Sequence, residues 1–147
     1  MTKVFLLLVF ALNTTIIFGQ NLTATQLLNK AIAYHDPQGN WEDFSGELFI
    51  TMKTPNNSDR LSEITIDLPQ QYFKLVTKKD NTTTEQILSK QDCKLLLNGS
   101  NTISEEETKK HRLTCERARN IKNYYTYLYG LPMKLKDPGT ILDPKVY

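Results

Sequence analysis

The sequence predicts an α+β protein, in which an antiparallel β-meander forms an incomplete, unclosed half-barrel covered by an N-terminal helix and a later tyrosine-rich helix. Within residues 45–97, five short segments alternate apolar and polar residues and are separated by turn residues. This pattern is typical of antiparallel strands with one buried face. Helical patterns precede and follow the run, and an apolar sheet face needs such a cover.

The first 19 residues have the features of a secretory signal peptide. Lys3 gives a positive start, residues 4–12 are an unbroken apolar run, and Gly19 is a small residue at the expected cleavage site. The alternative, an anchored N-terminal helix, needs about 20 apolar residues, and the polar residues 13–15 interrupt this run. No cysteine that could be acylated lies near the cleavage site. We therefore expect a periplasmic or secreted protein whose mature chain has no transmembrane anchor.

Residues 20–147 are predicted to form a single domain. With 39% hydrophobic and 23% charged residues, the composition is that of a globular protein and neither disordered nor transmembrane. Residues 1–19 carry one lysine and no acid, so the remainder has 17 Lys+Arg against 16 Asp+Glu and a net charge of +1. This balance gives no electrostatic basis for binding nucleic acid.

The first helix is expected between residues 23 and 35. Thr23 and Gln26 have the spacing of a capping box, and the helix should end at Asp36 because the residue before Pro37 is driven out of the helical conformation. The residues on its predicted apolar face are Leu27, Leu28, Ala31, Ile32, Tyr34 and His35. Such an amphipathic helix must lie on an apolar surface.

Strands are predicted at residues 46–53, 61–68, 72–76, 82–88 and 93–97. The inward-facing apolar residues of the first three strands are Leu48, Ile50, Met52, Ile64, Ile66, Leu68, Phe73 and Leu75. The fourth segment is mostly polar, which indicates an exposed or edge strand. Just before the first strand, the rings of Trp41 and Phe44 are expected to pack against the end of the sheet. The alternative is that they stack on a ligand.

Two helical segments follow the sheet. Ser104 and Glu107 form a second capping box that begins a short helical turn, and a longer helix is predicted over residues 114–129. The apolar stripe of the longer helix consists of Ala118, Ile121, Tyr125 and Leu128. Its four tyrosines suit either a half-buried helix, the preferred interpretation, or the rim of an apolar pocket.

Beyond this helix, residues 131–136 are predicted to form a further strand and residues 141–147 to begin a partner strand. The final hairpin therefore looks cut short, and we expect the domain to be truncated at its C-terminus.

Cys93 and Cys115 are predicted to form a disulfide, because they are the only two thiols of an exported chain. A metal site would need more soft ligands nearby, and a redox pair is normally Cys-x-x-Cys. The bond would fasten the long helix to the fifth strand. Closing this loop should stabilise the fold by about 3 kcal/mol in the chain-entropy model.

Two stretches carry a resemblance to a known family. His35-Asp36-Pro37 with Trp41, Phe44 and Gly46, and later residues 124–140 (YYTYLYGLPMKLKDPGT), resemble an uncharacterised family of exported proteins from Bacteroidota. The order of helix, meander and covering helix resembles the LolA/LolB-like superfamily of bacterial lipoprotein-sorting proteins. That resemblance implies one LolA-like domain, with an apolar concave face that can hold acyl chains. No motif aligns with that superfamily's lipid-positioning residues, so none is transferred.

Catalysis is not expected. His35 and His111 are far apart in the sequence, and the chain has neither a glycine-rich phosphate loop nor a Gly-x-Ser-x-Gly motif. Acids such as Asp36 and Glu42 suit turns and caps better than an acid/base pair. We therefore predict no catalytic residues, no metal site and no cofactor.

Two functions remain open at this point. The first is an exported protein that binds an apolar ligand, a lipid or a lipidated protein, on the concave face of the half-barrel. The predicted lining of that site is Trp41, Phe44, Leu48, Ile50, Met52, Ile64, Ile66, Leu68, Phe73, Leu75, Tyr125 and Leu128. The second is a structural or protein-interaction module in which the same residues form a filled core. Hydrophobic periodicity does not distinguish the two.

Overall fold

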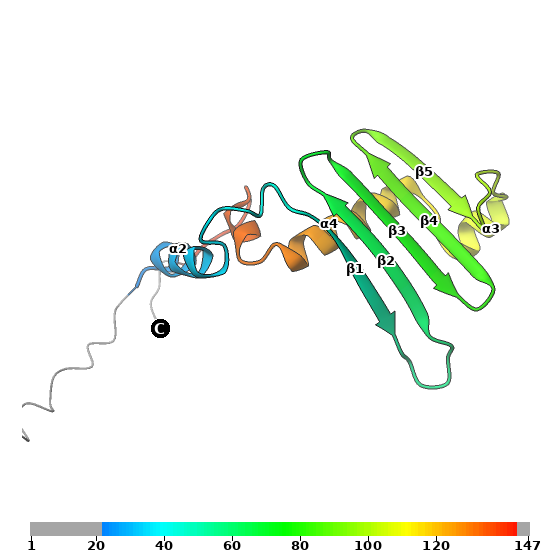
Figure 1. The fold of residues 1–147 in the computed structure, drawn as a ribbon, viewed down its shortest axis with the longest axis horizontal. Coiled ribbons are helices and arrows are strands. Elements are labelled where there is room, and N and C mark those ends of the chain that lie inside the picture. The colour runs from blue at the N-terminus through cyan, green and yellow to red at the C-terminus, as the bar shows by residue number, and fades with distance from the viewer. Residues whose placement is uncertain (1–21, 144–147) are drawn as a thin grey trace, which may run out of the picture.

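The computed structural model describes residues 22–143, so the predicted signal peptide lies outside the described residues. The elements, in chain order, are α2 (Ala24–His35), β1 (Ser45–Met52), β2 (Arg60–Asp67), β3 (Tyr72–Lys79), β4 (Thr82–Ser89), β5 (Asp92–Leu97), α3 (Glu105–His111), α4 (Cys115–Tyr129) and the 3-10 helix η1 (Met133–Lys136). The predicted class is confirmed: an open antiparallel meander is packed with an N-terminal helix and a later tyrosine-rich helix (Figure 1).

The sheet has the strand order β1-β2-β3-β4-β5, and every neighbouring pair is antiparallel. The prediction of an exposed or edge position for β4 is wrong, because β4 lies between β3 and β5 and both Gln86 and Leu88 are buried. The polar character of β4 has another cause. One face of the strand is open to solvent, and the buried face becomes polar toward one end of the sheet.

The core lies between one face of the sheet and α4, which crosses behind the strands (Figure 1). Cross-strand pairing places Ile66 opposite Phe73 and Phe73 opposite Leu88, which gives one continuous apolar row. Phe73 and Ala118 of α4 are both fully buried. The small Ala118 side chain allows the helix to approach the sheet closely, so this part of the interface is filled.

α2 lies at one end of the molecule, where Ile32 borders the same cavity as Met133 of η1 (Figure 1). The predicted capping box is confirmed, since the Thr23 and Gln26 side chains each accept a hydrogen bond from the other residue's backbone N–H. The apolar face is narrower than predicted. Leu28 is buried, but Leu27 is 59% exposed and Tyr34 is 82% exposed, and Ala31 and Ile32 are half-buried while His35 is exposed.

The turn between α2 and β1 is organised by Asp36, whose carboxylate accepts the backbone N–H groups of Asn40 at 2.7 Å and Trp41 at 3.0 Å. Trp41 stacks on Phe44 with 5.3 Å between ring centroids. Trp41 also lies against Gly130, where any side chain would collide with the indole. This contact joins the entry to the sheet with the end of α4.

The predicted strand at residues 131–136 is wrong: this segment contains η1. Its backbone donors are satisfied locally, since Lys134 N–H donates to the Gly130 carbonyl at 2.8 Å and Leu135 N–H to the Pro132 carbonyl at 3.0 Å. Residues 141–143 have no regular structure, and the remainder of the predicted partner strand lies outside the described residues.

Candidate ligand pocket between the sheet and α4

Most of the predicted lining residues are core residues. Ile64, Ile66, Phe73 and Leu75 are at most 5% exposed, and the half-buried side chains packed against them include Phe44, Leu48, Ile50, Leu68 and Tyr125. Two residues expected to face inward do not. Met52 is 42% exposed at the end of the edge strand β1, and Leu128 is 46% exposed near the C-terminal end of α4.

A cavity of about 550 Å³ lies between α4 and the other end of this sheet face. Here the inward positions change from apolar to polar, because Ser62 is paired with Thr77 and Thr77 with Thr84 across three strands. The sheet side of the pocket is lined by Arg60, Ser62, Leu75, Thr77, Thr84 and Gln86, and the helical side by His111, Thr114, Glu116, Arg117, Asn120, Ile121, Tyr124 and Tyr125. The short hydroxylated side chains of this row leave space under the helix, whereas the row of Ile66, Phe73 and Leu88 carries larger apolar side chains.

Two buried polar atoms in the pocket wall lack a partner. Gln86 is only 6% exposed, and neither its Oε1 nor the buried Nε of Arg60 has a hydrogen-bond partner in residues 22–143. An unsatisfied buried donor or acceptor costs about 1–3 kcal/mol. The Arg60 Nε–H is a donor and the Gln86 Oε1 is an acceptor, and both residues line the same cavity.

The pocket carries an excess of positive charge. A second cavity of about 560 Å³ shares Arg60, Thr77, Thr84 and His111 with the first. The charged residues that line the two cavities are Arg60, Arg117, Lys79, Lys110, Glu116 and Asp80. The ion pairs found within residues 22–143 lie elsewhere, as in Lys74–Glu85 and Lys78–Glu63. The arginines of the pocket are therefore without an acidic partner in this part of the chain.

Tyrosines form an aromatic wall on the helical side. Tyr124 and Tyr125 meet edge to face, with 5.3 Å between ring centroids. Burial raises the pKa of the Tyr125 phenol above its usual 10.0, and the positive charge of Arg60 partly offsets that rise. Tyr125 is therefore a neutral, protonated side chain at physiological pH, and its hydroxyl can donate a hydrogen bond.

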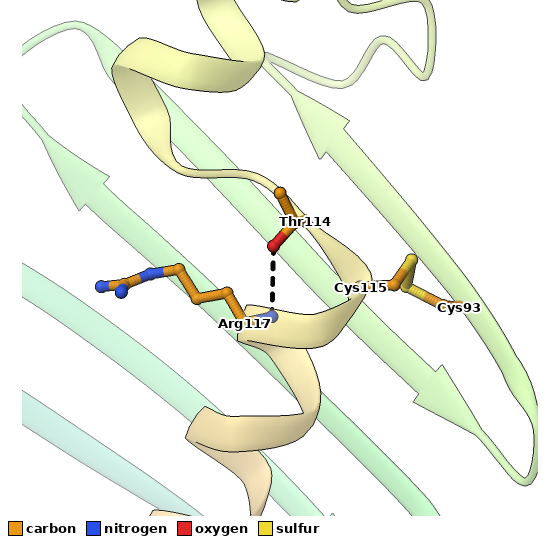
Figure 2. Close-up of a disulfide and its surroundings, with 4 residues drawn as sticks. All are labelled: Cys93, Thr114, Cys115 and Arg117. Carbon is orange, nitrogen blue, oxygen red and sulfur yellow. Dashed lines mark hydrogen bonds between the residues drawn. A yellow bond between two sulfur atoms is a disulfide. The ribbon is translucent and has the colours of Figure 1, made fainter.

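The first turn of α4 is fixed by a cap and a covalent bond. The predicted Cys93–Cys115 disulfide is confirmed, with 5.9 Å between the two Cα atoms. The Thr114 side chain accepts a hydrogen bond from the Arg117 backbone N–H at 3.2 Å (Figure 2). Figure 2 shows the Arg117 side chain extending away from the disulfide, on the opposite side of the helix. The disulfide thus sets the rotation of α4 and directs Arg117 toward the pocket.

The sequence prediction missed most of this pocket. Of the predicted lining residues, Leu75 and Tyr125 border the pocket. Its polar lining residues Arg60, Gln86 and Arg117 are not among those that the sequence predicts. A signal was present in the strand alternation. Ser62, Thr77 and Gln86 occupy inward positions, where a filled core would place apolar residues.

Neither a metal centre nor a membrane-spanning helix is found in the described part of the chain. Residues 22–143 contain no group of three or more His, Cys, Asp or Glu side chains placed to hold a metal ion. Within the same residues, no helix combines the length and apolar character needed to cross a bilayer.

The fold and the pocket define a class: an open antiparallel sheet whose one face is covered by a disulfide-linked helix, with a partly polar pocket between them. The chain belongs to a family of unknown function, DUF6503, whose family model matches residues 2–146. No curated protein and no solved structure matches the chain.

Proposed function

We propose that this is an exported, non-catalytic protein that binds an amphiphile, a lipid or the acyl part of a lipidated protein, in the pocket between the sheet and α4. The observation that carries the proposal is the cavity of about 550 Å³ in which buried, unpartnered polar atoms lie near an apolar wall. This volume is within the range of small-molecule sites, which are apolar with a few polar groups that orient the ligand.

The pocket has room for both parts of an amphiphile. Leu75, Ile121 and Tyr125 give an apolar surface for a chain, and Arg60 and Gln86 give a polar surface for a head group. The core next to the pocket is closed to solvent, because Ile64 and Ile66 are each 1% exposed. The chain of the ligand would therefore lie along α4 toward solvent, and a deep acyl tunnel is not part of the proposal.

Export is supported by the N-terminal sequence and by the disulfide, since such bonds persist in oxidising compartments. The open sheet and its covering helix support our proposal of a distant relation to the LolA/LolB-like proteins, in a family of exported Bacteroidota proteins. The second candidate function is a structural module, and the filled core favours it.

Native mass spectrometry of the non-reduced chain titrated with decanol, decanoate and N-decanoylglycine tests the proposal. We expect one-to-one binding of at least one of these amphiphiles. Thr84→Trp places an indole in the pocket and should abolish binding, whereas Thr83→Trp, one position along on the opposite face of β4, should bind like the wild type. Equal binding by the two variants, or no binding to the wild type, would favour the structural module.

A further inference from the structure

We infer that the ligand of this pocket is an anionic amphiphile whose negative group pairs with Arg60 and whose N–H or O–H group donates a hydrogen bond to Gln86. This inference rests on the proposed function and specifies the ligand of the same site. It follows from which atoms of the pocket lack a partner and from the charge of the pocket.

Arg60 lacks a negative partner within residues 22–143. Its Nε is buried without an acceptor, and arginine in general is a cationic side chain that favours anionic partners. No acid of residues 22–143 forms an ion pair with it. A carboxylate or phosphate is the acceptor that best fits a guanidinium, because both present oxygen pairs at matching spacing.

Gln86 requires a donor. It lies on β4 directly between Leu75 of β3 and Leu95 of β5, and neither neighbouring side chain offers a polar hydrogen. With the residue 94% buried and Oε1 unpartnered, the cavity is where a donor can reach it. The ligand must therefore present a polar hydrogen as well as a negative group.

The remaining charges favour an anion over a cation. The two cavities share lining residues, and their basic side chains are Arg60, Arg117, Lys79 and Lys110, whereas the acidic ones are Glu116 and Asp80. A cationic amphiphile would be repelled by this surplus, and a neutral one would leave Arg60 unpaired. Acylated amino acids have the required features, since they combine an apolar chain, an amide N–H and a carboxylate.

Three probes that differ by one feature each test the inference by calorimetry on the disulfide-bonded wild-type protein. N-decanoylglycine has the N–H and the carboxylate, N-decanoylsarcosine lacks the N–H, and N-decanoylglycine methyl ester lacks the charge. We expect the ester to bind about 10- to 100-fold more weakly than the acid, and the sarcosine derivative about 2- to 10-fold more weakly.

Two variants assign these differences to residues. In Arg60→Gln, the affinity for N-decanoylglycine should fall to that for its methyl ester, and the affinity for the ester should stay unchanged. In Gln86→Leu, N-decanoylglycine and N-decanoylsarcosine should bind with equal affinity. Arg119→Gln is the control, because it removes a positive charge from α4 outside the pocket. It should change neither the preference for the acid over the ester nor the preference for the glycine probe over the sarcosine probe. If the ester binds the wild type as tightly as the acid, or the sarcosine probe as tightly as the glycine probe, the inference is overturned while the proposed function stands. If no probe binds, both fail.

Discussion

At the scale of single residues, Gln86 is a buried polar side chain whose amide oxygen has no partner in residues 22–143. A buried amide between two leucines destabilises the sheet unless something donates to its oxygen. A residue that only had to fill the core at this position would be apolar. Under the proposal above, a ligand that donates a hydrogen bond to this oxygen would account for the presence of Gln86 on β4.

Gln86→Leu should therefore stabilise the ligand-free protein by about 1–3 kcal/mol, because it removes an unsatisfied buried acceptor and keeps a similar volume. Urea unfolding of the two proteins measures the difference. The same substitution at the exposed Gln91, in the turn between β4 and β5, is the control and should change the free energy of unfolding by less than about 0.5 kcal/mol. A loss of stability in Gln86→Leu would mean that the amide has a partner in the free protein.

Tyr125 makes stability depend on alkaline pH. Because burial raises its pKa in the folded state, the unfolded chain ionises first as the pH rises through the usual value of 10.0. The stabilising contribution is complete below that pH and is lost as the pH rises further. We expect the free energy of unfolding to be lower at pH values above 10 than at pH 8, and the difference to be smaller in Tyr125→Phe. An equal fall in both proteins would show that another group is responsible.

At the scale of elements, α4 and the sheet were predictable to different degrees. The alternation around Ile64, Ile66 and Phe73 and the stripe containing Ala118 predicted which faces meet, and the structure confirms them. Hydrophobic periodicity carries no information on the distance between the sheet face and the helix face that cover each other. For this reason it did not predict the pocket. It also misplaced β4, because polar inward positions such as Gln86 look like those of an edge strand.

The disulfide joins these two elements and should contribute measurably to stability. The bond closes a loop with a sequence separation of 22 residues, and its removal is expected to cost about 3 kcal/mol through the larger entropy of the unfolded chain. The double variant Cys93→Ser and Cys115→Ser, unfolded in urea without reductant, measures this cost. The wild-type protein unfolded in the presence of reductant should have the same free energy of unfolding as the double variant. A change below about 1 kcal/mol in both would indicate that packing alone holds α4 in place.

At the scale of the whole molecule, the two faces of the sheet differ. α4 covers one face, and none of the helices in residues 22–143 covers the other, which faces the viewer in Figure 1. That outer face carries the Lys74–Glu85 and Lys78–Glu63 pairs. Phe49 lies on it and is 74% exposed.

This asymmetry predicts very unequal effects on stability when two phenylalanines of the sheet are truncated. Phe73→Ala should destabilise the protein by about 3–5 kcal/mol, because the ring is completely buried. Phe49→Ser should change the free energy of unfolding by less than about 0.5 kcal/mol. Urea unfolding at low protein concentration measures both, and a large loss in Phe49→Ser would show that the outer face is covered in solution.

α4 is held at both ends, by the disulfide at Cys115 and by the indole of Trp41 against Gly130. The gap between the helix and the sheet is consequently set before any ligand arrives. An amphiphile would enter without waiting for a segment to open or fold, so its association rate should be close to that of an ordinary diffusional encounter. Differences in affinity between ligands would then appear as differences in how long each one stays bound.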